Sequence, residues 1–252
     1  MTDTSVAAGR LAQNEFRLGS VISRSGAVLS RHFLTFFTVT VIAYSPALLI
    51  ASLQGTQPTE PAEALSQALW SLLAVVLLLV LSQLGDAIIL HVAFQDMRRR
   101  PIRLVESLNV AFSRLLPLIG IALVQGFLTL LGIALLIIPG LILLSMWLVG
   151  VPACVVERRG PWESLRRSRE LTKGHRWKVL AVALLLPVVS VGASPIESIL
   201  TAAAGPIAGL VGQLIWTGIW AAFSAVVLTI TYHDLRVIKE GVDIEQIAGV
   251  FD

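Results

Sequence analysis

The distribution of basic residues constrains this chain more than any other feature. All 19 lysines and arginines lie outside three long, mainly apolar stretches, residues 32–97, 115–157 and 179–235. A transmembrane helix needs about 20 apolar residues to cross the hydrocarbon of a bilayer. Each stretch is therefore too long for one span and has room for two.

A turn signal near the middle of each stretch supports this division, because Gly and Pro interrupt helices. The interruptions are QGTQPTEPAE at 54–63, Pro139-Gly140, and GASPIES at 192–198 followed by Ala204-Gly205-Pro206. The sequence predicts an all-α membrane protein with six transmembrane helices arranged as three hairpins. The expected spans lie near 32–53, 65–94, 115–137, 140–156, 178–193 and 206–233.

The charge pattern also predicts how the chain is oriented. Basic residues favour the cytoplasmic side of a membrane, so we expect both termini and the two linkers between hairpins to be cytoplasmic, in a bacterial inner membrane. The net charge of +3 does not indicate a nucleic-acid partner, because the basic residues flank apolar runs as membrane anchors do. Residues 1–31 contain no apolar run of signal-peptide length, so the first span is expected to be an uncleaved anchor.

The three hairpins resemble one another within a single integral membrane domain, residues 1–252. Possible repeats cover 10–97, 98–157 and 158–236, followed by a short cytoplasmic tail at 237–252. Each hairpin follows a polar segment that we expect to be an interfacial or cytoplasmic helix. Each closes on an acid followed by an arginine: Asp96/Arg98, Glu157/Arg158 and Asp234/Arg236. Internal repeats are common in membrane proteins, but basic linkers alone also produce some similarity.

Four arginines near the N-terminus are spaced by seven residues: Arg10, Arg17, Arg24 and Arg31. This spacing drifts only about 20° per step on a helix, so they form one stripe, and Leu11, Leu18, Ile22 and Leu29 form another. Such a helix is expected to lie in the membrane interface with its arginines toward anionic headgroups. The alternative is that these polar helices only anchor the bundle. The candidate headgroup contacts are Arg17, Arg24, Arg31, Arg98, Arg99, Arg103, Arg166 and Arg167.

Two polar residues inside the second span form a candidate intramembrane site. Gln83 and Asp86 are three residues apart, so they share one face of a helix. An ionisable side chain inside a membrane is a functional candidate. A proton or substrate site is one interpretation, and a polar cap held by a neighbouring helix is the other.

Sequence motifs for chemistry are absent. The chain has no P-loop, dinucleotide fingerprint, zinc helix or nucleophile elbow. We therefore expect no catalytic, cofactor or metal site, and no enzyme activity.

The stretch 137–180 nevertheless carries a recognisable pattern. Its matching elements are Ile138-Pro139-Gly140, Pro152, Glu157, Glu163-Ser164-Leu165, Ser168, Leu171-Thr172-Lys173-Gly174 and Trp177. On these residues the chain resembles bacterial inner-membrane proteins grouped with the membrane domain of glycerophosphoryl diester phosphodiesterases. The resemblance implies a multi-span inner-membrane protein without catalytic residues, because in fused members the phosphodiesterase chemistry belongs to a separate soluble barrel domain.

Three functional hypotheses follow. The first is a non-catalytic inner-membrane scaffold or regulatory module in envelope homeostasis, in contact with the phospholipid bilayer and its anionic headgroups. It would act with a membrane-protein partner or as a homo-oligomer. The second is a transporter of a lipid or small amphipathic solute, which would use Gln83 and Asp86. The third is a membrane-embedded lipid enzyme.

Overall fold

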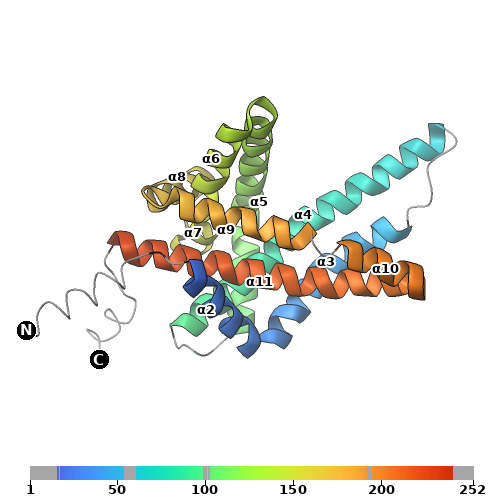
Figure 1. Cartoon of the computed structure of the whole chain (residues 1–252), viewed down its shortest axis with the longest axis horizontal. Helices are drawn as coiled ribbons and strands as arrows, with labels where there is room; N and C mark the ends of the chain where they lie inside the picture. Colours follow the sequence, from blue (N-terminus) through green and yellow to red (C-terminus); the bar gives the residue numbers. More distant parts are fainter. Residues whose placement is uncertain are drawn as a thin grey trace, which may run out of the picture.

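The computed structural model describes residues 16, 18–53, 61–98, 101, 103–191 and 194–240. Every regular element within these ranges is a helix (Figure 1). In chain order the helices are α2 (Leu18–Arg31), α3 (Phe33–Leu53), α4 (Pro61–Met97), α5 (Leu104–Leu135), α6 (Ile137–Trp147), α7 (Gly150–Glu157), α8 (Pro161–Thr172), α9 (Arg176–Val191), α10 (Ser194–Ala204) and α11 (Pro206–Glu240).

Five segments of the described chain are long and apolar enough to cross a membrane, as in a multi-span membrane protein. They are Phe33–Ile50, Glu63–Met97, Leu104–Leu135, Ile137–Glu157 and Pro206–Glu240. The span expected near 178–193 is not among them, because α9 has only 16 residues and a span needs about 20.

The packed core surrounds the C-terminal halves of α4 and α11. The helix α11 contacts α2, α3, α4 and α10 along its length (Figure 1). Ile89 and Val92 of α4 are buried together with Ile230 and Leu235 of α11. The N-terminal half of α4 instead exposes large apolar side chains such as Trp70. An apolar face of this kind suits contact with lipid.

Small residues allow α3 to approach both of its neighbours closely. A Cβ atom added at Gly85 of α4 would lie 3.1 Å from the Cβ of Ala43, and one added at Gly218 of α11 would lie 3.1 Å from the ring of Phe37. Beside this contact, the Oγ1 of Thr40 donates a hydrogen bond to the carbonyl of Gly218 at 2.8 Å. Close packing and polar contacts between helices are the usual means of helix association in membranes.

The span expected at 140–156 consists of two helices, because the helical structure is interrupted between α6 and α7. The break leaves the carbonyl of Met146 near a helix end, where it lacks a partner within its own helix. The Oγ of Ser168 in α8 donates to this carbonyl at 2.7 Å, and the Oγ1 of Thr172 approaches it at 3.4 Å. The inner face of α8 therefore stabilises the break.

The helix α2 packs on protein through its apolar side. Val21, Ser25 and Val28 are buried, and Leu18 and Leu29 pack against the core. We expected this side to face lipid, whereas in the structure α2 lies against α11. Arg10, Arg17 and Leu11 lie outside the described residues, so this finding covers only the second half of the predicted stripe.

Candidate functional site

Each acid that was predicted to close a hairpin binds a basic side chain from elsewhere in the fold. Asp96 of α4 binds Arg31 (Nη1–Oδ2 3.0 Å) and His32 (Nε2–Oδ1 2.9 Å). Asp234 of α11 binds Arg24 (Nη1–Oδ1 2.7 Å). These ion pairs connect α2 and the start of α3 to the ends of α4 and α11.

The third acid, Glu157, lies at the centre of a larger cluster. Its Oε1 accepts hydrogen bonds from Nε of Arg167 at 2.7 Å and from the hydroxyl of Tyr232 at 2.8 Å, and its Oε2 lies 2.7 Å from Nε of Arg159. Arg167 also binds Glu240, which in turn binds Arg236. This cluster, which we call the Glu157 cluster, connects α7, α8 and α11.

The charge of Arg167 is held within this cluster. Burial alone would lower the pKa of its guanidinium. The hydrogen bonds and negative charges of Glu157 and Glu240 outweigh burial and raise that pKa above its ordinary value. Arg167 therefore stays protonated, and its donors are directed at protein carboxylates.

The outer side of α8 and the start of α9 carry a second arrangement of cations. Trp162, Arg166, Arg169 and Lys173 follow one another at spacings of four, three and four residues, so they share one face of the helix. They are exposed, as are Trp177 and Lys178 at the start of α9. We call these six residues the basic-aromatic surface. The opposite face of α8 is buried through Ser164, Leu165, Ser168, Leu171 and Thr172.

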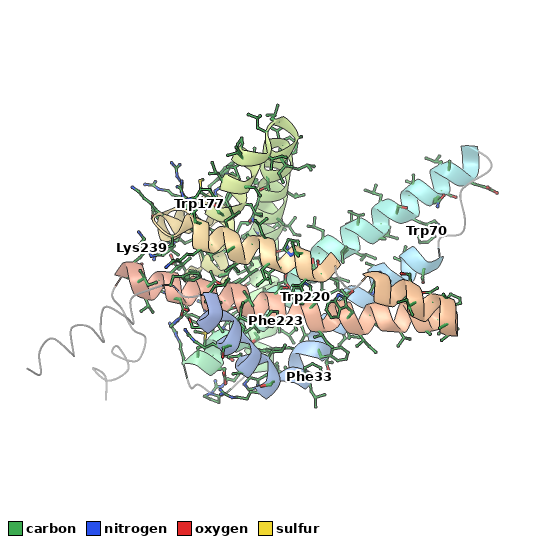
Figure 2. The ribbon with its side chains drawn as sticks, in the orientation of Figure 1. Phe33, Trp70, Trp177, Trp220, Phe223 and Lys239 are labelled. Atoms are coloured by element: carbon green, nitrogen blue, oxygen red, sulfur yellow. The ribbon has the colours of Figure 1, made fainter. Side chains whose placement is uncertain are left out.

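Lys239 and His175 extend the basic-aromatic surface. Figure 2 shows Trp177 and Lys239 at the same end of the molecule, although they come from α9 and α11. His175 lies close enough to Lys239 and Lys178 to interact with them, because its pKa is lowered by burial and further by the positive charges of these two lysines. The Nε of Arg176 is buried and has no hydrogen-bond partner among the described residues.

The eight arginines predicted as headgroup contacts are divided between these environments. Arg24, Arg31 and Arg167 form the ion pairs given above. The guanidinium of Arg98 lies 4.6 Å from the ring centre of Phe94, and the backbone N–H of Arg103 donates to Gln95. Arg166 belongs to the basic-aromatic surface, and Arg17 and Arg99 lie outside the described residues.

The other five members of the basic-aromatic surface were not predicted as headgroup contacts, although the spacing of its α8 residues was visible in the sequence.

The predicted intramembrane site gains a third residue from α3. Tyr44 lies close enough to Asp86 for the two side chains to interact electrostatically. The Oε1 of Gln83 is buried without a hydrogen-bond partner in the described part of the chain, and no described residue forms an ion pair with Asp86. Sequence reasoning missed Tyr44 because its proximity depends on how α3 packs against α4. Within the described ranges, no three His, Cys, Asp or Glu side chains are grouped as a metal site would require.

These features are typical of a helical membrane protein: long apolar helices, a charged, aromatic surface at one end, and a polar group inside the apolar segments. No protein-family model, curated protein or solved structure matches the chain. Its family resemblance therefore stays a prediction. The residues that carry it have structural roles here: Ser168 and Thr172 bind the α6–α7 break, and Glu157 organises its cluster.

Proposed function

We propose that this chain is a non-catalytic integral membrane protein that binds anionic lipid headgroups through the basic-aromatic surface. In this proposal it acts as a scaffold or regulatory module on the cytoplasmic side of a bacterial inner membrane. The observation that carries the proposal is the one-sided arrangement of Arg166, Arg169 and Lys173 between Trp162 and Trp177. Tryptophan favours the headgroup level of a bilayer, and each nearby lysine or arginine adds roughly 1 kcal/mol of attraction to an anionic surface.

The cations of this surface are available to a lipid phosphate, unlike those of the Glu157 cluster. Among the described residues Arg166 is paired only with Glu170, at 3.3 Å, and its side chain is 83% exposed. An exposed pair of this kind contributes only about 0–1 kcal/mol, so a phosphate that binds arginine through two parallel hydrogen bonds can replace the carboxylate.

The proposed topology has both termini in the cytoplasm. Because every basic cluster belongs on one side, the number of crossings between clusters must be even. Six crossings satisfy this condition. Five are the candidate spans given above, and α9 and α10 together would make the sixth.

A lipid titration tests the proposal. The wild type and the triple variant Arg166→Gln, Arg169→Gln, Lys173→Gln are purified in mild detergent, and bound phosphatidylglycerol is counted by native mass spectrometry. We expect the triple variant to retain less phosphatidylglycerol at each lipid concentration, with phosphatidylcholine binding unchanged. The matched control is Glu170→Gln, which removes a competing carboxylate from the same helix and is expected to increase binding. Equal phosphatidylglycerol binding by all three proteins contradicts the proposal.

The second candidate function is transport, and it rests on the polar group formed by Asp86, Gln83 and Tyr44. A carboxyl inside the membrane can carry a proton between two faces. The test measures proton flux into proteoliposomes with an internal pH-sensitive dye. A flux that Asp86→Asn abolishes, and that the control Gln213→Leu leaves intact, would favour transport over the scaffold.

A further inference from the structure

The pair formed by α5 and α6 ends in a tip that has no polar side chain. Every residue from Leu130 to Leu144 is apolar or glycine. At the tip, Leu136 is 67% exposed and Ile138 is 72% exposed. The pair projects away from α11 and carries this tip at its far end (Figure 1). A turn that emerges into water normally carries polar residues, and this one carries none.

The long span of α4 differs in this respect. The helix α4 begins with Glu63, Ser66 and Gln67 in its first two turns. Glu63 and Ser66 are exposed. The start of α4 is therefore suited to the polar interface or to water, whereas the tip of the α5–α6 pair is suited to hydrocarbon.

The turn between α5 and α6 is short, and part of its backbone is hydrogen-bonded. Only Leu136 separates the two helices, and its N–H donates to the carbonyl of Gly132 at 3.0 Å. The carbonyl of Leu136 accepts a hydrogen bond from the N–H of Gly140 at 3.4 Å, and Pro139 has no N–H to satisfy. These bonds satisfy the N–H groups of Leu136 and Gly140, and each satisfied group lowers the cost of keeping the turn in hydrocarbon.

Close contact between the two helices keeps the tip narrow. A Cβ atom added at Gly140 would lie 2.3 Å from the Cγ1 of Ile133 and 2.6 Å from its backbone nitrogen. One added at Gly132 would lie 3.0 Å from the Cα of Gly140. The backbones of α5 and α6 therefore touch, and the outer surface of the tip consists of apolar side chains, chiefly leucine and isoleucine.

The length of the pair limits how far the tip can reach. The segment Ile137–Glu157 has 21 residues, which corresponds to about 31 Å of continuous helix at ~1.5 Å per residue. The break between α6 and α7 and an ordinary tilt both shorten this reach. With Glu157 at one interface, the tip ends at or before the opposite edge of a hydrocarbon layer about 30 Å thick.

We propose that residues 130–144 remain inside the hydrocarbon of the leaflet opposite Glu157 and contact lipid acyl chains. The α5–α6 pair thus enters the membrane and returns without exposing a turn to water on the other side. The second hairpin then makes no complete crossing, so the six crossings of the proposed topology become four, and their number stays even. The inference does not depend on the lipid-headgroup proposal, because residues 130–144 and the basic-aromatic surface are separate parts of the protein.

Single cysteines in the full chain test this inference. In a Cys154→Ala background, cysteine is placed at Leu136, at Ile138, at Glu63 and at Arg166, and each protein is reconstituted into vesicles that are then permeabilised. A charged maleimide should label Glu63→Cys and Arg166→Cys. It should label Leu136→Cys and Ile138→Cys no more than the cysteine-free protein, until detergent unfolds the chain.

A second measurement separates acyl chains from a protein partner. A nitroxide attached at position 136 or 138 should be relaxed by oxygen, which concentrates in hydrocarbon, and not by a water-soluble nickel complex. Labelling of Leu136→Cys and Ile138→Cys to the level of Glu63→Cys would overturn the inference. So would a nitroxide shielded from both relaxing agents, because that result indicates a second copy or another protein covering the tip.

Discussion

Tyr232 of α11 donates a hydrogen bond to Glu157 of α7, with 2.8 Å between its hydroxyl oxygen and Oε1. Tyr232 is fully buried, and Glu157 binds Arg167 and Arg159 at the same time. This contact joins residues 75 positions apart in the chain. It attaches the end of the last long helix to the segment that carries α7 and α8.

We expect Tyr232→Phe to destabilise the protein by about 1.5–3 kcal/mol, the range for a hydrogen bond to a charged group. The ring is kept, so packing changes little, while Glu157 loses one of its donors. The measurement is the free energy of unfolding in mild detergent. The control is Arg166→Gln, which removes an exposed pair with Glu170 and is expected to cost about 0–1 kcal/mol. Equal effects of the two substitutions would show that the Glu157 cluster contributes no special stability.

Ser168→Ala tests the stabilisation of the α6–α7 break. The substitution removes the 2.7 Å hydrogen bond to the carbonyl of Met146, and a buried acceptor without its donor costs about 1–3 kcal/mol. We therefore expect a lower free energy of unfolding. Thr172→Ala is expected to have a smaller effect, because its contact with Met146 is longer, at 3.4 Å.

The matched control for this prediction is Ser113→Ala. The hydroxyl of Ser113 is exposed and, among the described residues, bonds only to the carbonyl of Val110 in its own helix, so its removal should change stability by less than about 0.5 kcal/mol. An unchanged stability of Ser168→Ala would mean that the Met146 carbonyl finds another donor.

Helix content was predictable here because hydropathy is a local property of the sequence. The segments α3 and α4 follow from apolar stretches without basic residues, and α5 and α11 each contain such a stretch with basic residues outside it, Arg114 in α5 and Arg236 and Lys239 in α11. The break after Trp147 was not predicted, because it is stabilised by Ser168, which lies 22 residues further along the chain from Met146. The pairing of Arg24 with Asp234 joins residues 210 positions apart, and no local pattern indicates it.

The side to which an amphipathic helix turns was harder to predict than its existence. The apolar residues of α2 would suit lipid or protein equally well, since both environments exclude water. The structure places Val21 and Val28 against protein. The candidate site shows the same limit: Gln83 and Asp86 were identified because they lie on one helix, whereas Tyr44 comes from another.

His175 provides a test of pH dependence. Burial and two nearby lysines lower its pKa from the ordinary value of 6.5, so the folded protein binds this proton less readily than the unfolded chain. Below pH 6.5 the unfolded state gains a proton that the folded state resists, and stability falls as the pH decreases. We expect His175→Gln to reduce the loss of stability between pH 8 and pH 5.5, as measured by thermal unfolding. The control His233→Gln removes a histidine that lies 3.5 Å from Asp234 and should not reproduce this effect.

Gly140→Ala is expected to separate α5 from α6. The added methyl group would lie 2.6 Å from the backbone nitrogen of Ile133, a contact that flexible side chains cannot relieve, so the two helices must move apart. Gly126→Ala in the same helix pair is the control, because nothing lies within 4 Å of its Cβ position. There alanine should stabilise the helix by up to about 1 kcal/mol. We therefore expect Gly140→Ala to lower the midpoint of thermal unfolding and Gly126→Ala to raise it. A rise for both variants would show that the contact between Gly140 and Ile133 is not maintained in the membrane.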